Sequence, residues 1–380
     1  MRRGLVLLLM LCALCAGCGG SSGPPRHVVL HVAPHSALID APVSVTLRGL
    51  HAGDRVRVSA AAPDYRGARY TASVAARADA RGAARIQGGE LLAELRGADG
   101  QYLPRFGTTT FRLTADVDGH RAASATLVRA TDGAGVRGQR LTVRRDGLAG
   151  DFFIRPGAHG VPVVAIGGSG GQQPEYEAQL LAAHGHPALA LDYFGGPGLP
   201  GTLRRIPLEY FQRGLRWVAR RTGAARVALY GVSRGGEGAL IIGSRYPSLV
   251  AGVVALVPSA TIGLALDDPH APAWTLGGRP LPGGTQIPVE RIRGPVLTAS
   301  GGRDAVWPSA DYTREIHARL RANHFRFAHP DLRYPAAGHG VSSPPYLPGI
   351  PASESGGTPA ADAAARAALW PRVLRFLADL

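Results

Sequence analysis

The sequence predicts two folded units, an immunoglobulin-like β-sandwich followed by a larger α/β unit with a mostly parallel sheet. Two observations predict this division. Residues 27–138 hold short runs of β-formers separated by turn residues, whereas strand-like and helix-like segments alternate through residues 139–380. A length of 380 residues suits two domains, and 45% hydrophobic against 18% charged residues is typical of globular proteins.

The first eighteen residues are expected to be an export signal. A basic start is followed by an apolar run from Leu5 to Ala16, which is too short to span a bilayer, and then by small residues. Ala16-Gly17-Cys18 resembles a bacterial lipobox, although Cys15 stands where that motif usually has leucine. A lipid on Cys18 would anchor the protein on the periplasmic side of a bacterial membrane, with residues 19–26 as a tether. The alternative is simple signal cleavage, which would leave a soluble periplasmic or secreted protein.

Charge and cysteine content exclude several function classes. The formal charge is +15 and there is no lysine, but the arginines are scattered, with no run longer than two, so a nucleic-acid partner is not predicted. A basic patch that attracts a phosphate-bearing substrate stays open. All three cysteines precede residue 19, so we expect neither a disulfide nor a cysteine nucleophile in the folded units. No histidine or carboxylate spacing indicates a metal site, and no cofactor is expected.

In the first unit we expect several short strands and no helix of convincing length. The strand-like segments are 28–32, 43–47, 55–58, 70–74 and 109–113. This spacing is typical of a β-sandwich. Because these segments contain no catalytic constellation, we expect the unit to pack against the second one and shield the substrate.

The second unit begins with a predicted hairpin, in which segments 141–144 and 151–154 flank Asp146-Gly147. The further strand-like segments are 161–166, 187–191, 227–230, 252–257 and 295–300. Helix-like segments are 174–184, 208–221, 312–321 and 361–380, together with one that follows residue 233. Because strands and helices alternate, the sheet should be mostly parallel, with its functional loops at the carboxyl ends of the strands.

A nucleophile is predicted at Ser233. It lies in Gly231-Val-Ser-Arg-Gly235, between a strand-like segment and a helix-like one, which is the arrangement of the nucleophile elbow of α/β-hydrolases. Side chains at 231 and 235 would collide with neighbouring backbone at so sharp a turn. The helix that follows directs its first N–H groups at the site, so the N–H of Arg234 is a candidate oxyanion donor.

An acid and a base should follow the nucleophile in the order Ser, acid, His. Asp304 comes directly after an apolar strand, and His339 lies in a glycine-flanked loop before the last helix. The rival carboxylates lack this placement or lie on a helix; these rivals are Asp267, Asp268, Asp311 and Asp331. His317 and His324 are expected on the surface, and His329 is the competing base, because it lies next to the last predicted strand.

Two further segments have open interpretations. Gly167-Gly-Ser-Gly-Gly171 follows a predicted strand and does not match a dinucleotide fingerprint. In a hydrolase it would supply the second oxyanion donor, from the N–H of Ser169 or Gly170, with no preference between them. The long segment from Ser259 to Ile292, which contains Trp274, is either a cap that selects an acyl chain or an ordinary excursion.

Beyond its expected export signal, the chain resembles the family of acyl-CoA thioesterases and bile acid-CoA:amino acid N-acyltransferases. Its β-domain motifs are echoed by segments 32–34, 38–43 and 47–56. Its catalytic-domain motifs are echoed by Gly167–Gly171, Tyr193-Phe-Gly-Gly-Pro-Gly-Leu-Pro200, Pro207–Phe211, Gly231–Glu237, Asp304 with Trp307-Pro-Ser309, and Gly338-His339 with Pro344–Pro348. Several specific motifs in the family's order support the resemblance.

This resemblance implies a Ser233-Asp304-His339 triad that hydrolyses fatty acyl thioesters to free acid and thiol. The family's transferases use cysteine as nucleophile, so serine favours hydrolysis without excluding acyl transfer. Two alternatives remain open. Because CoA thioesters are cytosolic, an exported protein suits a carboxylesterase or acyltransferase that acts on other acyl substrates. The second alternative is a catalytically inert surface-binding protein. Acyl chain length and oligomeric state are not predicted.

Overall fold

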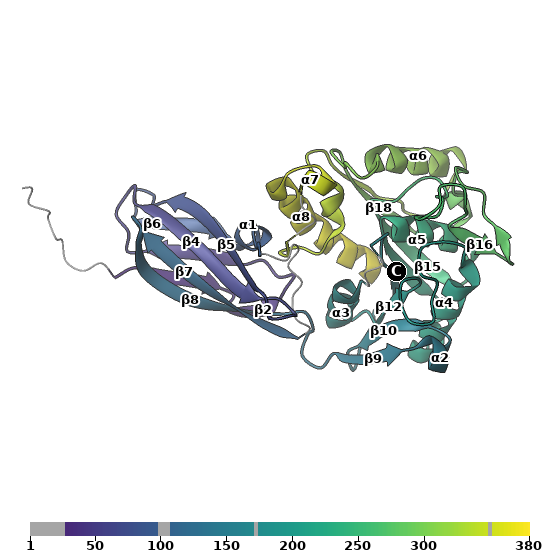
Figure 1. The fold of residues 1–380 in the computed structure, drawn as a ribbon, viewed down its shortest axis with the longest axis horizontal. Helices are drawn as coiled ribbons and strands as arrows, with labels where there is room; N and C mark the ends of the chain where they lie inside the picture. Colours follow the sequence, from purple (N-terminus) through teal and green to yellow (C-terminus); the bar gives the residue numbers. More distant parts are fainter. Residues whose placement is uncertain (1–26, 98–106, 171–173, 349–351) are drawn as a thin grey trace, which may run out of the picture.

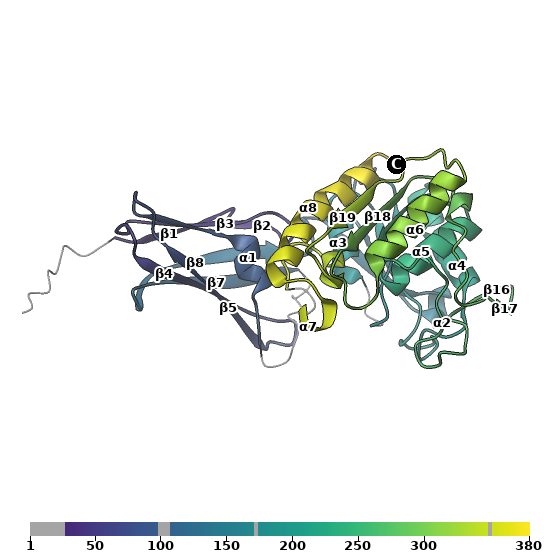
Figure 2. The ribbon, with the colours of Figure 1, turned by 90° about the horizontal axis from the view of Figure 1, so that it is seen from above.

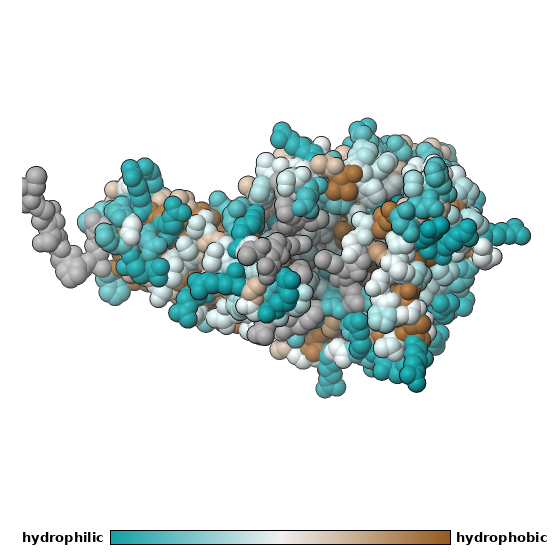
Figure 3. All heavy atoms as spheres, viewed as in Figure 1, coloured by the Kyte–Doolittle hydropathy of each residue, from teal (hydrophilic) through white to brown (hydrophobic). Residues whose placement is uncertain are grey.

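A computed structural model describes residues 27–97, 107–170, 174–348 and 352–380. The expected export signal, its Cys18 and the tether at 19–26 lie outside the described residues, as does Gly171. The N-terminal β-rich unit and the α/β unit follow one another along the long axis of the molecule (Figure 1). Hydrophilic residues are scattered over the viewed face of both units (Figure 3).

The N-terminal unit is a sandwich of two sheets, as the sequence predicted. The smaller sheet has the order β1 (Val29–Ala33), β3 (Ser44–Arg48), β6 (Ala83–Gln87). The larger sheet has the order β2 (Ser36–Leu38), β8 (His120–Ala130), β7 (Thr108–Val117), β4 (Arg55–Pro63), β5 (Arg69–Arg77). Buried residues alternate with exposed ones along β4 and β7, and Leu47, Val58 and Leu113 from the two sheets belong to one core.

The sequence analysis missed β2, β6, β8 and the short helix α1 (Gly88–Ala93). Strand β8 was missed because its first half is largely exposed and lacks apolar alternation. It is held by antiparallel pairing with β7 along its whole length. The turn between them, Asp118-Gly119, has positive φ at both residues, and Asp-Gly at such a turn is the sequence signal that indicates a hairpin.

The α/β unit is built on one eight-stranded sheet. Its order is β19 (Asp331–Tyr334), β18 (Val296–Gly301), β15 (Val250–Leu256), β14 (Val227–Val232), β11 (Val163–Ile166), β12 (Ala188–Asp192), β10 (Ala149–Ile154), β9 (Arg137–Leu141). Strands β9, β10 and β12 pair antiparallel, and all other neighbours pair parallel. This mostly parallel sheet, with the sharp turn at Ser233 after β14, is the α/β-hydrolase fold.

The start of this sheet differs in detail from the predicted hairpin. Strand β9 covers Arg137–Leu141, so the boundary expected between residues 138 and 139 falls inside it, and the segment expected as strand 141–144 forms mainly the one-turn helix α2 (Val143–Asp146). The Asp146 carboxylate accepts a hydrogen bond from the Thr142 N–H at 2.8 Å, which closes the turn. Gly147 then takes a left-handed conformation, with φ 67°.

Helices cover both faces of the sheet (Figures 1 and 2). On the face toward the sandwich lie α3 (Glu175–Ala183) and α8 (Pro359–Ala378). On the other face lie α4 (Leu208–Thr222), α5 (Arg234–Arg245) and α6 (Ser309–Ala322). The four helices with predicted ranges are thus confirmed to within a few residues. Successive side chains of β11 alternate between the two cores, because a strand turns alternate side chains to opposite faces.

A buried carboxylate joins the sandwich to the α/β unit. Asp40 lies in the turn after β2, and its Oδ2 accepts hydrogen bonds from Trp370 Nε1 of α8 and from His184 Nε2, each at 2.6 Å. The buried Arg129 guanidinium donates to the carbonyl of Ile39, at 2.8 Å, and to that of Ala41. Both sides of this turn are therefore fixed by polar contacts.

Candidate active site

Ser233 occupies a strained turn at the carboxyl end of β14. It lies between the last residue of β14 and the first residue of α5, with φ 56° and ψ −121°. Positive φ is uncommon for a residue with a side chain. A Cβ added to Gly231 would lie 2.2 Å from the Gly235 carbonyl oxygen, and one added to Gly235 would lie 2.2 Å from that of Ile166. The expected requirement for glycine at both positions is confirmed.

Asp304 and His339 form a hydrogen-bonded pair. His339 Nδ1 lies 2.8 Å from Asp304 Oδ2, and both side chains are almost fully buried. Asp304 Oδ1 accepts from the backbone N–H groups of Val306, at 3.0 Å, and Trp307, at 3.3 Å. Because a carboxylate with these partners acts as an acceptor, we assign the proton of the neutral imidazole to Nδ1, which leaves Nε2 free as a base.

The three residues follow different strands but share one edge of the sheet. Ser233 follows β14, Asp304 follows β18, and His339 opens the short helix η2 (His339–Ser342) after β19. Carboxyl ends of parallel strands meet at the same edge. Within the described residues no hydrogen bond joins Ser233 to His339.

The loop that carries His339 is held from two sides. The Trp307 indole packs edge-on against the His339 ring, with centroids 5.9 Å apart, and its Nε1 donates to the Val257 carbonyl at 3.0 Å. On the other side the Gly338 N–H donates to Asp362 Oδ1 of α8 at 2.7 Å. Burial raises the pKa of Asp362, and the Gly338 N–H and Arg366 partly oppose this rise. The sequence analysis missed Asp362, and its position in the first turn of the last helix was the only signal for it.

The candidate oxyanion donors lie on two sides of Ser233. Arg234 is the first residue of α5, so its N–H belongs to the helix N-terminus. Gly168 packs directly against Ser233: a Cβ added to it would lie 3.2 Å from Ser233 Cβ and 3.7 Å from Ser233 Oγ. Ser169 and Gly170, the two expected donors, follow in an exposed turn. The choice between them stays a prediction.

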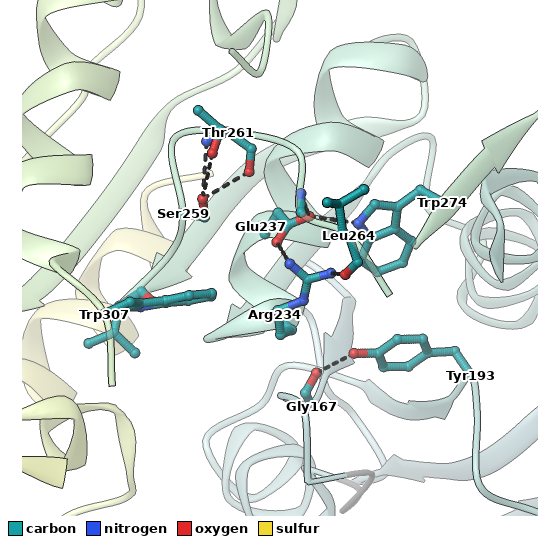
Figure 4. A network of polar contacts seen from close by, with 11 residues as sticks. Gly167, Tyr193, Arg234, Glu237, Ser259, Thr261, Leu264, Trp274 and Trp307 are labelled. Carbon is teal, nitrogen blue, oxygen red and sulfur yellow. Dashed lines mark hydrogen bonds and ion pairs between the residues drawn. The ribbon is translucent and has the colours of Figure 1, made fainter. Parts of the chain in front are cut away.

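The Arg234 side chain enters a buried polar network (Figure 4). Its NH1 lies 2.6 Å from Glu237 Oε2, and its NH2 donates to the Leu264 carbonyl at 2.7 Å. Glu237 Oε1 accepts from Trp274 Nε1 at 2.7 Å and from the Gly263 N–H at 2.8 Å. Burial raises the pKa of Glu237, and Arg234 and the two N–H donors partly oppose this rise. Because all these partners donate, they suit an ionised carboxylate.

Several known proteins and one family model are similar to this chain. The model of the BAAT/acyl-CoA thioester hydrolase C-terminal region matches residues 281–380. A peroxisomal succinyl-coenzyme A thioesterase from Mus musculus is 28% identical over 397 residues, covering 89% of this chain and 93% of that protein. The mitochondrial acyl-coenzyme A thioesterase 2 of Homo sapiens is 29% identical, with 89% and 81% covered. Acyl-coenzyme A thioesterase 1 of Homo sapiens is 31% identical, with 64% and 65% covered.

Residues 281–380 thus match the BAAT/acyl-CoA thioester hydrolase family, and the three relatives are 28–31% identical to this chain. The resemblance seen in the sequence motifs is thereby confirmed. The segment that matches the family model contains Asp304, His339 and Asp362. Among solved structures, the chain is similar to a dienelactone hydrolase-like phosphotriesterase from metagenomic libraries, with a TM-score of 0.45, 18% identity, and 65% of this chain and 99% of that chain covered.

His329, the competing base, forms a separate cluster with His317. His317, expected on the surface, is buried: its Nε2 lies 2.8 Å from Thr298 Oγ1 and 3.9 Å from Asp331 Oδ1. The His329 ring stacks on it with centroids 5.5 Å apart. Burial lowers the pKa of His317 to about 4. The prediction was wrong because His317 lies on the same stripe of α6 as Thr313, Ile316 and Leu320, which faces the sheet.

The excursion from Ser259 to Ile292 packs closely on the α/β unit. It contains β16 (Trp274–Leu276), which pairs with β13 (Ile206–Pro207) and β17 (Arg279–Pro280), and the short helix η1 (Val289–Arg291). Trp274 is fully buried. Among the described residues, no helix has the length and apolarity for a membrane span, and no three His, Cys, Asp or Glu residues are grouped as metal ligands.

Proposed function

We propose that this chain is a serine hydrolase that cleaves fatty acyl thioesters to a free acid and a thiol. Ser233 is the nucleophile, His339 the base, and Asp304 the acid that orients the base. The hydrogen bond of 2.8 Å between His339 and Asp304 carries this proposal, because it holds the imidazole in the tautomer that can accept a proton at Nε2. The strained backbone of Ser233 supports its role as nucleophile.

In the acylation step, Ser233 Oγ attacks the acyl carbonyl carbon while its proton passes to His339 Nε2. The carbonyl oxygen becomes an oxyanion, which accepts hydrogen bonds from the Arg234 N–H and from the N–H of Ser169 or Gly170. Collapse of this intermediate breaks the carbon–sulfur bond, and the thiol leaves with the proton from His339. The acyl group is then an ester of Ser233.

Deacylation repeats these steps with water as the nucleophile. His339 Nε2 takes a proton from water as the water oxygen attacks the acyl carbon, and the same donors hold the second oxyanion. His339 then returns the proton to Ser233 Oγ, and the free acid leaves. Throughout, the Asp304 carboxylate stabilises the imidazolium that forms in each step.

The names of the relatives support a CoA thioester as the substrate, because the three relatives described above are named as CoA thioesterases. The expected export signal favours a second candidate function, a carboxylesterase or acyltransferase on non-CoA acyl substrates, since CoA thioesters are cytosolic. The hydrogen-bonded pair Asp304–His339 argues against the third possibility, an inert binding protein.

The deciding experiment uses the chain from Ser22 onward beside a Ser233→Ala control. We compare kcat/KM on a long-chain acyl-CoA with kcat/KM on an oxo-ester of the same chain length. A preference for the thioester that is lost in the control supports the thioesterase. A preference for the oxo-ester keeps the triad and discards CoA. Equal turnover by both proteins, together with no labelling of Ser233 by an active-serine phosphonate, would overturn the enzyme proposal.

Export and lipid attachment are part of the same proposal. We expect a lipid on Cys18, which would tether the enzyme to a membrane through residues 19–26. Expression of the full chain in bacteria with a labelled fatty acid should give a labelled protein, and Cys18→Ser should lose the label. Cys15→Ser is the matched control and should keep it. An unlabelled but truncated wild type would instead support simple signal cleavage.

A further inference from the structure

Tyr193 belongs to a sequence motif that the proposed chemistry leaves without a role. It follows β12 directly and opens the segment Tyr193–Pro200, one of the motifs that resembles the family. Its side chain is buried, and its hydroxyl donates a hydrogen bond of 2.8 Å to the carbonyl of Gly167. Gly167 begins the loop that packs on Ser233 through Gly168. Tyr193 therefore contacts the backbone of one half of the candidate oxyanion site.

The other side of the Tyr193 ring leads to the second half of that site. The ring stacks on Trp274, with centroids 5.9 Å apart and an interplanar angle of 17°. Trp274 Nε1 donates to Glu237 Oε1 at 2.7 Å, and Glu237 Oε2 pairs with Arg234 NH1 at 2.6 Å. Figure 4 shows these side chains in an arc beside Gly167 and Arg234. A continuous series of contacts thus joins the two backbone segments that flank Ser233.

We propose that Tyr193 and Glu237 are positioning residues that, with Trp274 between them, set the separation of the Gly167–Gly170 loop from the first residue of α5. Their effect is to let N–H groups from both segments reach one oxyanion. This inference rests on the proposed function, since it concerns the oxyanion of that reaction. Neither side chain touches the substrate in this scheme.

Oxyanion binding explains why such a restraint is needed. The donors must lie about 2.7–3.1 Å from the developing oxyanion, and a small displacement weakens both hydrogen bonds. The N–H of Arg234 is fixed by the helix, but Ser169 and Gly170 lie in an exposed turn beyond the end of β11. A hydrogen bond to the Gly167 carbonyl restrains that turn where it leaves the sheet. Burial raises the pKa of Tyr193, so its hydroxyl stays a donor across the working pH range.

The test for Tyr193 compares two matched substitutions, Tyr193→Phe and Tyr210→Phe. Tyr210 is also buried, and its hydroxyl donates to the carbonyl of Asp192 at the end of β12, at 2.6 Å. Each variant removes one hydroxyl and keeps the ring. We expect Tyr193→Phe to lower kcat on an acyl ester about tenfold with KM little changed, and Tyr210→Phe to change kcat by less than about twofold. Equal kcat in the two variants would overturn the role of Tyr193.

A transition-state analogue separates positioning from a general loss of structure. A trifluoromethyl ketone with the substrate's acyl chain forms an oxyanion on Ser233, whereas the free fatty acid does not. In Tyr193→Phe we expect the inhibition constant of the ketone to rise by the same factor as kcat/KM falls, and that of the fatty acid to stay constant. Parallel weakening of both inhibitors would indicate a merely structural role and would contradict the proposal.

Glu237→Gln tests the other end of the series, with Glu290→Gln as its control. Glu290 lies in the same excursion as Trp274 and pairs with Arg319 of α6, away from Ser233. Glu237→Gln should lower kcat/KM at least about tenfold and Glu290→Gln by less than about twofold. Hydrogen exchange by mass spectrometry should show faster exchange of residues 259–266 in Glu237→Gln alone, since the Gly263 N–H bonds to that carboxylate.

Hydrogen exchange also keeps the positioning proposal separate from the proposed reaction. If the wild type neither hydrolyses esters nor reacts with a phosphonate, the proposed function fails. The comparison of Tyr193→Phe with Tyr210→Phe in residues 164–170 still decides whether Tyr193 holds that loop. Faster exchange in Tyr193→Phe supports positioning, and identical exchange in both variants overturns it.

Discussion

Asp362 and Gly338 join the last helix to the loop of the candidate base. The Gly338 N–H donates to Asp362 Oδ1 at 2.7 Å, and Gly338 immediately precedes His339. Asp362 is buried in the first turn of α8, beside Arg366. A Cβ added to Gly340 would lie 2.7 Å from Asp362 Oδ2, so the loop packs directly on this carboxylate. The orientation of His339 therefore depends on a residue outside the proposed triad.

Asp362→Ala should reduce both activity and stability. It leaves the Gly338 N–H without its acceptor and Arg366 without its neighbouring charge, and buried groups left in this way cost about 1–3 kcal/mol each. We expect kcat to fall about tenfold or more, and the midpoint of urea unfolding to fall as well. Asp379→Ala, at an exposed carboxylate near the end of the same helix, is the control. Asp362→Asn keeps an acceptor oxygen and should restore most of the activity. Full activity in Asp362→Ala would show that the loop holds itself.

Asp304→Asn should lower kcat strongly while the protein stays folded. An amide that donates to His339 Nδ1 favours the wrong imidazole tautomer, and in serine proteases the equivalent change lowers kcat about 10⁴-fold. We expect a loss of about 10³–10⁴-fold here, measured on the ester of the proposed assay. Asp331→Asn is the control: it removes a carboxylate at the start of the neighbouring strand β19 and should leave kcat within about threefold of the wild type. Similar activity in both variants would remove Asp304 from the mechanism.

The stability of the fold should fall between pH 6.5 and pH 4 in part because of His317. Burial lowers its pKa from 6.5 to about 4 in the folded chain, against the opposing carboxylate of Asp331. In this window the unfolded chain binds a proton that the folded chain does not, so the free energy of unfolding falls as the pH falls. Above pH 7 both states are neutral at this site, and the effect disappears.

His317→Gln measures that contribution. Urea unfolding at pH 7.5 and pH 5 should show a loss for the wild type that exceeds the loss for the variant by about 2 kcal/mol. His329, which stacks on His317, is half-buried and provides the control substitution His329→Gln. An equal pH dependence in the wild type and His317→Gln would contradict the assignment.

Asp40→Ala should weaken the contact between the sandwich and the α/β unit. Asp40 accepts hydrogen bonds from Trp370 and His184, and its charge lies near the buried Arg129. Removing one partner from such a buried network costs about 2–4 kcal/mol. We expect a lower midpoint of urea unfolding and faster proteolysis between the units. Asp116→Ala breaks the exposed ion pair with Arg121 within the sandwich and should cost less than about 1 kcal/mol. Equal losses in both variants would contradict a junction role.

Several parts of the candidate site could be predicted because they are local in sequence. The elbow at Ser233 requires glycine on both sides, and those glycines are adjacent in the chain. Asp304 follows a strand that its apolar residues reveal, and its pairing with His339 agrees with the order of the sequence. The large helices show the period of an amphipathic helix. Each of these features depends on neighbours along the chain or on a short motif.

The missed features depend on which distant segments meet. Glu237 has three polar partners, and two of them, Gly263 and Trp274, come from the excursion after β15. Nothing near Tyr193 in the sequence indicates that its hydroxyl reaches Gly167. The sequence suggests that His317 is exposed, because histidine is polar, but it lies on the side of α6 that faces the sheet and is buried.

By itself, the sequence determined the fold class and the sharp turn at Ser233, and it predicted Asp304 and His339 as the candidate acid and base, because hydrophobic period, glycine and strand-end position are local properties. Only the tertiary structure decided which side chains orient those residues. A hydrogen bond needs a donor and an acceptor atom within about 3 Å of each other. The strand order β18-β15-β14-β11-β12 brings together loops that lie far apart in the chain. The hydrogen bonds between Asp362 and Gly338 and between Tyr193 and Gly167 form because the sheet sets that order.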